Sequence, residues 1–147
     1  MGRGRRSRAG GADSGARRPV DDVQVCAGCG RGFTWRPSLA ADWEKVRWCS
    51  DACRRRGIRP VDRALEAAIL TLLDEQRDQH GADVTTCPTE ATRRVDPDDA
   101  AALHEPARRA ARRLVADGTL EMLQNGRVVD PSRAKGPVRL RRVRSVR

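Results

Sequence analysis

Four cysteines in a short segment constrain this chain more than any other feature. Two residues separate Cys26 from Cys29, three separate Cys49 from Cys53, and nineteen lie between the two pairs. A segment of about 35 residues buries too little apolar surface to fold unaided, so it needs a metal ion or disulfides. Paired cysteines at this spacing are typical of zinc sites. The sequence therefore predicts one structural Zn²⁺ bound by Cys26, Cys29, Cys49 and Cys53.

The alternative is two disulfides, or free thiols in a core. A fifth cysteine, Cys87, makes the number odd, no apolar stretch follows the basic N-terminus, and no apolar run reaches the length of a membrane span. We therefore expect a cytoplasmic protein without membrane contacts, in which reduced cysteine pairs bind zinc more often than each other. Cys87 has no partner at ligand spacing, and we expect a buried structural thiol rather than a nucleophile.

The residues around the cysteines predict the local fold. Glycines in the Cys-Ala-Gly-Cys-Gly segment let backbone N–H groups approach the sulfurs, as in a zinc knuckle. Ser50 and Asp51 suit the start of a helix, whose first turn would carry Cys49 and Cys53. A knuckle followed by a helix that carries the last ligands is a treble-clef-like arrangement. Four thiolates leave no coordination position for a substrate, so the zinc is predicted to be structural.

All the aromatic residues of the chain fall between or beside the cysteine pairs: Phe33, Trp35, Trp43 and Trp48. A small metal-dependent domain needs such side chains in its interior. We expect them to pack there, and stacking against nucleic-acid bases is the alternative.

The chain divides into three parts on composition. Residues 1–20 have little to bury and are predicted to form a disordered basic tail. Residues 21–59 form the zinc finger, and residues 60–147 form a second domain with a basic C-terminal tail. Gly57 and Pro60 bracket the link, because glycine tends to end a helix and proline cannot continue one.

The second domain has helical signals first. Asp62 is a plausible N-cap for a helix to about Gln79, with an apolar stripe at Leu65, Ile69, Leu72 and Leu73. Pro88 suits the first position of a second, short helix that ends near Val95. A helical turn to His104 and a longer helix over residues 105–117 follow, with Gly118 as the terminating residue.

Strand signals follow the helices. Asn125-Gly126 is a strong signal for a two-residue hairpin, and Val138 and Leu140 continue an alternating pattern. Three helices followed by a β-hairpin is the order of a winged helix. The predicted fold class is therefore α+β, with two small domains: a treble-clef-like zinc finger followed by a winged helix.

The distribution of charge points to polyanions. The chain has a formal net charge of +10, of which residues 1–20 contribute +5 and residues 132–147 contribute +7. In the predicted helix over residues 105–117, a wheel places apolar residues on one arc and four arginines on the other. These arginines, with two on the last strand, are the candidate nucleic-acid-binding residues: Arg108, Arg109, Arg112, Arg113, Arg139 and Arg141. The alternative is a solvated helix face with Glu105 and Asp117 as local partners.

Two resemblances accompany these patterns. The motif Cys26-x-x-Cys29-Gly30-Arg31-x-Phe33-Thr34-Trp35-Arg36, followed by Cys49-Ser50-x-x-Cys53-Arg54, resembles a short zinc-finger-like bacterial family of unknown function. Residues 64–142 are similar to a second such family, through motifs that include Cys87-Pro88-Thr89-Glu90-Ala91 and Gly136-Pro137-x-Arg139-Leu140. The second resemblance implies a winged-helix-like fold. Neither family supplies a biochemical function.

The functional prediction is a small regulatory protein that binds DNA or RNA. The alternative is an adaptor that docks other proteins through the zinc finger and the winged helix. An enzyme is not predicted, because the sequence has no phosphate-binding glycine loop and no catalytic triad pattern, and it indicates no small-molecule substrate. His80 and His104 lack metal spacing, and we expect surface or capping roles for them.

Overall fold

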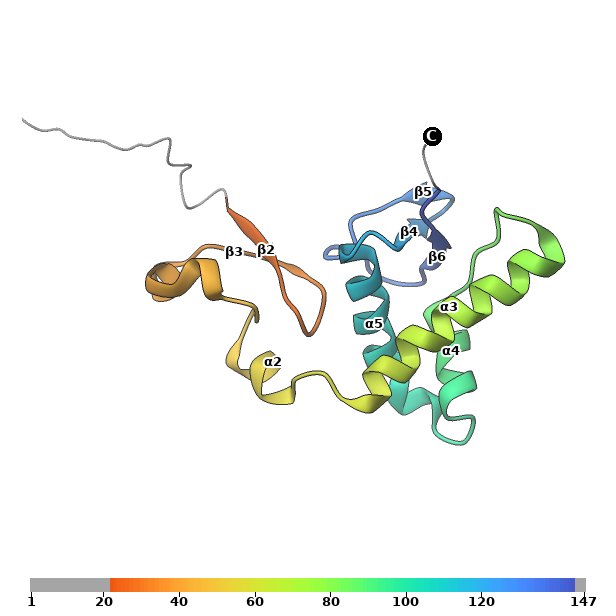
Figure 1. Cartoon of the computed structure of the whole chain (residues 1–147), viewed down its shortest axis with the longest axis horizontal. Helices are drawn as coiled ribbons and strands as arrows, with labels where there is room; N and C mark the ends of the chain where they lie inside the picture. Colours follow the sequence, from red (N-terminus) through yellow and green to blue (C-terminus); the bar gives the residue numbers. More distant parts are fainter. Residues whose placement is uncertain (1–21, 145–147) are drawn as a thin grey trace, which may run out of the picture.

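The computed structural model describes residues 22–144, and it combines helices with two small antiparallel sheets (Figure 1). The predicted disorder of residues 1–20 lies outside the described residues. We call residues 22–56 the cysteine module and residues 60–144 the helical module. No helix within residues 22–144 is both long and apolar enough to cross a membrane.

The cysteine module begins with a hairpin of β2 (Val23–Val25) and β3 (Gly32–Thr34), in which Val25 lies opposite Gly32. A 3-10 segment, η2 (Pro37–Lys45), and a short helix, α2 (Asp51–Arg56), follow. Phe33 and Trp43 meet edge to face, with ring centroids 5.6 Å apart. Phe33, Trp43 and Trp48 pack with the cysteines, as predicted, whereas the half-buried Trp35 lies outside this cluster.

The first helix of the helical module is α3 (Pro60–His80), and its N-cap is Arg59, three residues before the predicted N-cap Asp62. Pro60 takes the first helical position, where its missing N–H costs nothing. Asp62 lies two residues inside the helix, and its carboxylate accepts a 2.7 Å hydrogen bond from the Arg59 N–H. The predicted apolar stripe is confirmed, because Leu65, Ile69, Leu72 and Leu73 are all buried.

The next helices follow their local signals. Helix α4 (Pro88–Val95) begins and ends at the predicted residues, and the half-buried Cys87 lies at its N-cap rather than in the core. A 3-10 turn, η3 (Ala100–Leu103), leads into α5 (His104–Ala116), in whose first turn Pro106 is tolerated. Gly118 has the expected positive φ of 86°.

The second sheet has the strand order β5-β4-β6, formed by β5 (Arg127–Val128), β4 (Leu120–Gln124) and β6 (Arg139–Arg142). Gln124 pairs with Arg127, so Asn125 and Gly126 form the predicted two-residue turn, with φ of 53° and 78°. Buried Val138 and Leu140 close the core over α3 and α5, which confirms the alternating pattern.

Helix α5 lies between the two parts of the structure (Figure 1). Its alanines and Leu114 face α3, α4 and the sheet. Its other side meets the tip of the β2–β3 hairpin, which carries the first cysteine pair. The cysteines are therefore positioned directly against a helix of the other module.

Candidate metal centre

The four cysteines of the cysteine module form one cluster. Their sulfur atoms all lie within 4.8 Å of one another, and no other group of this kind occurs within residues 22–144. The Sγ–Sγ distances are 3.8 Å from Cys29 to Cys49 and 3.6 Å from Cys49 to Cys53. All five cysteines are free thiols, so the disulfide alternative is not formed. A tetrahedron with metal–sulfur bonds of about 2.3 Å has edges of about 3.8 Å, which this cluster matches.

The first cysteine pair is held by a tight turn. The N–H groups of Gly28 and Cys29 donate to Cys26 Sγ over 3.4 and 3.5 Å. Burial alone would raise the pKa of the Cys26 thiol, but backbone donors from Cys29, Cys49 and Gly28 lower it to about 7. These donors stabilise a thiolate, which is the form that binds metals. The predicted approach of backbone N–H groups to the sulfurs is therefore present.

The second pair belongs only partly to a helix. Ser50 is the N-cap of α2, and its hydroxyl accepts a 3.1 Å hydrogen bond from the Cys53 N–H. Cys49 therefore precedes the helix, and the prediction that both ligands lie on its first turn is wrong. The extended backbone of Ser50 still brings Cys49 over Cys53, and burial raises the pKa of the Cys49 thiol in the absence of a metal.

The expected exposure of Arg112 is wrong. This side chain is only 2% exposed, its Nε–H donates to the Cys29 carbonyl over 2.6 Å, and its Nη2 lies 2.9 Å from Glu105. Arg113 is 9% exposed and contacts the same turn, donating to the Gly28 carbonyl over 2.7 Å and pairing with Glu66 over 2.6 Å. The outer arc of α5 is thus covered by the cysteine module, which a helical wheel cannot reveal.

Arg109 reaches the cluster itself. Its Nη1 lies 3.8 Å from Cys53 Sγ, while its buried Nε and Nη2 have no hydrogen-bond partner. The guanidinium sits close to Gly28, since a Cβ added there would lie 3.1 Å from Arg109 Nη2 and from the Trp48 ring. Gly30 is packed still more closely, because its added Cβ would lie 2.4 Å from Arg112 Cβ. These glycines therefore also permit the two modules to approach.

The remaining candidate nucleic-acid residues bind within the protein too. Arg108 donates to the carbonyls of Gly136 and Ala134, Arg139 to Thr85, and Arg141 to Glu121. Contrary to the expectation of a free basic surface, each of the six arginines forms a hydrogen bond or an ion pair within the protein. Their binding to nucleic acid stays untested.

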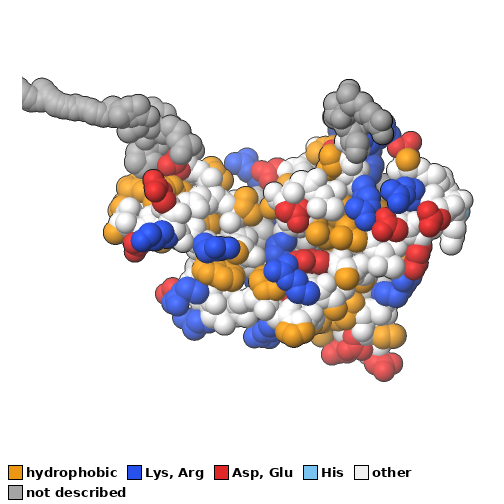
Figure 2. Space-filling model, viewed as in Figure 1, with side chains coloured by type: hydrophobic (Ala, Val, Ile, Leu, Met, Phe, Trp, Pro, Cys, Tyr) orange, Lys and Arg blue, Asp and Glu red, His pale blue; other side chains and the backbone are white. Residues whose placement is uncertain are grey.

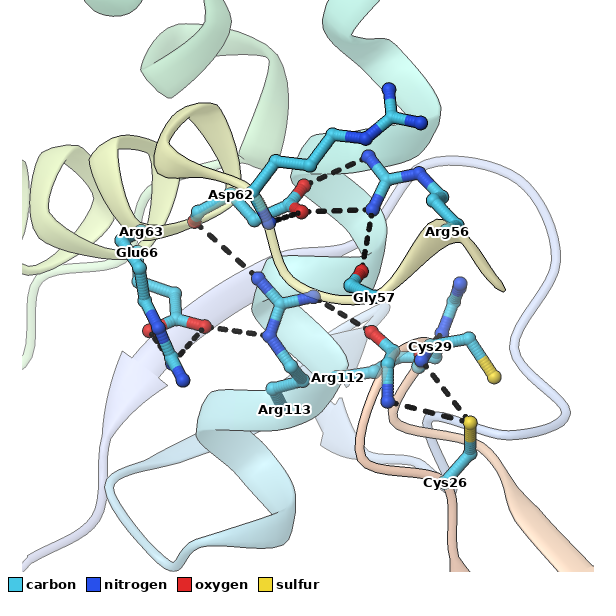
Figure 3. Close-up of polar contacts among 11 residues, drawn as sticks. Cys26, Cys29, Arg56, Gly57, Asp62, Arg63, Glu66, Arg112 and Arg113 are labelled. Atoms are coloured by element: carbon cyan, nitrogen blue, oxygen red, sulfur yellow. Dashed lines mark hydrogen bonds and ion pairs between the residues drawn. The ribbon is translucent and has the colours of Figure 1, made fainter. Parts of the chain in front are cut away.

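Three residues for which the sequence predicted no contact between the modules complete the junction (Figure 3). Arg56, at the end of α2, forms two hydrogen bonds with the Asp62 carboxylate over 2.8 and 2.9 Å. Glu66 accepts from both Arg63 and Arg113. Asp62 and Glu66 lie four residues apart and therefore on the same face of α3. This acidic pair close to the link was the sequence feature that could have predicted arginine partners there.

The donor set fits a tetrahedral metal ion. Four sulfurs at suitable distances supply the ligands, and the Arg109 guanidinium places a positive charge beside them, with its Nη1 3.8 Å from Cys53 Sγ. A divalent ion with four thiolates has a net charge of −2, which this cation complements. The four cysteines thus form a cluster that can bind a metal ion.

The fold and this cluster define a two-module protein of mixed helix and sheet, with a cysteine site built against an arginine-bearing helix. Residues 62–143 match the family described as "Protein of unknown function (DUF3253)". This range is more than half of the 147 residues, so the chain belongs to that family. Residues 21–56 match a second family, "Uncharacterized protein conserved in bacteria (DUF2256)". The two resemblances drawn from the sequence are confirmed, and no curated protein matches the chain.

Proposed function

We propose that this chain is a non-enzymatic zinc protein that binds nucleic acid, and that its contact surface lies on the cysteine module. One Zn²⁺ bound by Cys26, Cys29, Cys49 and Cys53 fixes the knuckle and the start of α2. Zinc suits four thiolates in tetrahedral geometry. A reducing compartment such as the cytoplasm keeps these thiols available.

The element order supports the two finer fold assignments. A hairpin knuckle followed by a helix with the last ligand is treble-clef-like. The order α3, α4, α5 and then the β4–β5 hairpin is that of a winged helix. In many winged helices the third helix enters the major groove, but here α5 is covered by the cysteine module. The nucleic-acid surface must therefore lie elsewhere.

A groove on the cysteine module carries the proposal. It has a volume of about 550 Å³ and lies between η2 and the start of α2. Leu39, Val46 and Trp48 give it an apolar part. Four cations and two carboxylates also line it: Arg36, Lys45, Arg47 and Arg54, with Asp42 and Asp51.

Two of the four cations in this groove have no partner within residues 22–144. Arg36 donates to the Cys49 carbonyl, and Arg54 pairs with Asp51. The side chains of Lys45 and Arg47 are exposed and form no hydrogen bond or ion pair with residues 22–144. On the helical module, by contrast, basic residues are commonly paired with acids, as in Arg94 with Glu75 and Arg142 with Asp74. In Figure 2, basic and acidic side chains are interspersed on the right-hand side. Unpaired cations beside an aromatic ring suit the phosphates and bases of a flexible single strand.

A charge-matched pair of variants tests the proposal. Affinity for a fluorescent single-stranded oligonucleotide is measured by anisotropy over a range of salt concentrations. We expect Lys45→Ala/Arg47→Ala to weaken binding at least 5-fold and to lower the salt slope by about 1.4, since each lost phosphate contact removes about 0.7. The control is Arg93→Ala/Arg127→Ala, which removes two exposed cations outside the groove that form no ion pair with residues 22–144. Equal losses in both variants would reject the groove, and no binding by the wild type would reject the function.

An adaptor role is the second candidate, and one observation favours it. Val23 and Val25 are 62% and 48% exposed on β2, a strand that pairs only with β3 among the described residues. An open strand edge with exposed valines can accept a strand from a partner. Loss of partner binding in Val25→Lys, with oligonucleotide binding absent in the wild type, would support this role instead.

A further inference from the structure

We infer that Arg109 is the counter-cation of the metal–thiolate centre, so that metal binding at the cysteines strengthens docking of the cysteine module on α5. This inference rests on the proposed zinc site. It adds a coupling between the metal and a helix that carries no ligand.

The first argument is the unpartnered guanidinium. Burying N–H donors of a cation without acceptors is costly, and native proteins rarely leave them so. Arg109 has two such nitrogens, Nε and Nη2. Two carboxylates that contact α5 are engaged with other arginines, Glu105 with Arg112 and Glu66 with Arg113. No carboxylate pairs with Arg109 within residues 22–144.

The second argument is what Arg109 does face. Its Nη1 lies 3.8 Å from Cys53 Sγ, a distance suited to an N–H···S contact. With a divalent ion bound, the four thiolates carry a net charge of −2. A cation partly shielded from water beside this dianion gains far more than beside neutral thiols. The side chain is therefore matched to the metal-bound form of the cluster.

The third argument separates Arg109 from its neighbours. Arg112 and Arg113 donate to the backbone carbonyls of Cys29 and Gly28, which are neutral acceptors. Those bonds depend on the shape of the knuckle, whereas the Arg109 contact depends on the charge of the centre. Arg109 is thus the positioning residue through which metal binding strengthens the contact between the cysteine cluster and α5.

Coupling of this kind is reciprocal. If the metal strengthens docking by some factor, docking strengthens metal binding by the same factor. Removing the Arg109 charge should therefore weaken zinc binding and should also weaken the stabilisation that zinc gives to the helical module.

The experiment uses the full chain and three variants. Arg109→Gln removes the charge, and Arg109→Lys retains it. Arg108→Gln is the control, because the Arg108 guanidinium bonds the carbonyls of Gly136 and Ala134 and not the cysteine cluster. Zinc affinity is measured by competition with a chromophoric chelator. Stability of the helical module is measured by circular dichroism melting with and without zinc.

We expect Arg109→Gln to weaken zinc binding 10- to 100-fold, as is typical when a group that supports metal ligands is removed. Its zinc-induced rise in melting temperature should shrink to less than half that of the wild type. Arg109→Lys should recover most of both effects, and Arg108→Gln should change neither.

Two outcomes would overturn the inference. One is wild-type zinc affinity in Arg109→Gln, and the other is an equal loss in Arg109→Lys and Arg109→Gln, which would point to shape rather than charge. If Arg109→Gln fails to fold, Arg109→Met, which keeps most of the side-chain length without the charge, takes its place in the same measurements. A wild type that binds no zinc would instead reject the proposed metal site.

Discussion

The Nε–H of Arg112 donates a 2.6 Å hydrogen bond to the carbonyl of Cys29, across 83 positions of the sequence. This bond joins the knuckle of one matched family to the third α-helix of the other. The guanidinium is buried, and burial lowers the pKa of Arg112 while Glu105 opposes the change. The partners of this buried cation come from both modules, so the contact fixes how the two modules are oriented.

Arg112→Ala should therefore destabilise the whole chain. It leaves the Cys29 carbonyl without its donor and opens a cavity at the junction, at a cost of about 2–4 kcal/mol. Urea unfolding followed by tryptophan fluorescence measures this loss. Arg93→Ala, an exposed arginine of α4, is the control and should stay within about 0.5 kcal/mol of the wild type. Similar small effects in both variants would mean that the junction contributes little.

Gly30 provides a test of the close approach itself. Its φ is +76°, and an added Cβ would lie 2.4 Å from Arg112 Cβ. Gly118 has a similar φ of +86° with nothing within 4 Å of an added Cβ. Gly118→Ala should cost about 1–2 kcal/mol from its backbone alone, and Gly30→Ala about 1–3 kcal/mol more from overpacking. Equal free energies of unfolding for the two variants would show that the close contact between Gly30 and α5 adds nothing to stability.

Local signals in the sequence predicted most of the individual elements. Pro88 marked the start of α4, Asn125-Gly126 marked the hairpin, and the cysteine spacing marked the cluster. Each of these depends on a few neighbouring residues, whose backbone preferences act over one turn. Helix starts differed from the prediction where a side chain bonded a nearby backbone N–H, as Asp62 does with Arg59 and Ser50 with Cys53.

The relation between the modules could not be predicted in this way. A helical wheel separates two faces of α5 but does not say what covers either of them. Arginine is ambiguous here, because its long stem can be buried while its head finds carbonyls and carboxylates. Arg112 and Arg113 thus had the pattern of a solvated or nucleic-acid-binding face, and they lie in an internal junction.

The link between the modules should resist proteolysis, contrary to what its Gly57 and Pro60 suggest. Arg56 Nη1 donates to the Gly57 carbonyl over 3.2 Å, and residues 57 and 58 are half-buried. A protease needs an exposed segment of extended chain. With zinc present, limited digestion by a non-specific protease should leave residues 22–144 uncut at the link, as checked by mass spectrometry. Early cleavage at residues 57–59 would show that the two modules are independent.

Removing the metal should reverse this protection. A small domain whose cysteines hold its only core depends on the ion to fold. Excess chelator should therefore expose residues 22–56 to digestion and shift the tryptophan emission to longer wavelength. The helical module has its own core and should keep most of its helicity. An unchanged emission spectrum in demonstrably metal-free protein would contradict a structural role for the ion.

The ion pair between Arg56 and Asp62 predicts how stability depends on pH. Burial tends to raise the pKa of the Asp62 carboxyl, but hydrogen bonds from Arg56 and from the Arg59 N–H lower it below its ordinary value. Between the lowered pKa of the folded state and the unfolded value of about 3.9, the unfolded chain binds more protons than the folded one. The contribution of Asp62 is therefore fully present above about pH 4 and is lost as the pH falls through its folded-state pKa.

Asp62→Asn should remove this contribution at every pH. Near neutrality the variant should be less stable by about 1–3 kcal/mol, because charged hydrogen bonds to Arg56 are lost. Below pH 4 the difference in stability between variant and wild type should narrow, since the wild-type carboxyl is then protonated and therefore uncharged as well.

Urea unfolding, followed by the circular dichroism of the helices between pH 2.5 and 7, measures the free energy of unfolding of both proteins against pH. Cysteine protonation releases a metal in acid, so both proteins are measured at the same excess of zinc and the bound metal is determined at each pH. Asp98→Asn is the control, because Asp98 is exposed and its carboxylate forms no ion pair with residues 22–144. A constant difference between Asp62→Asn and the wild type across this range would mean that the Asp62 contact is structural and does not depend on its charge.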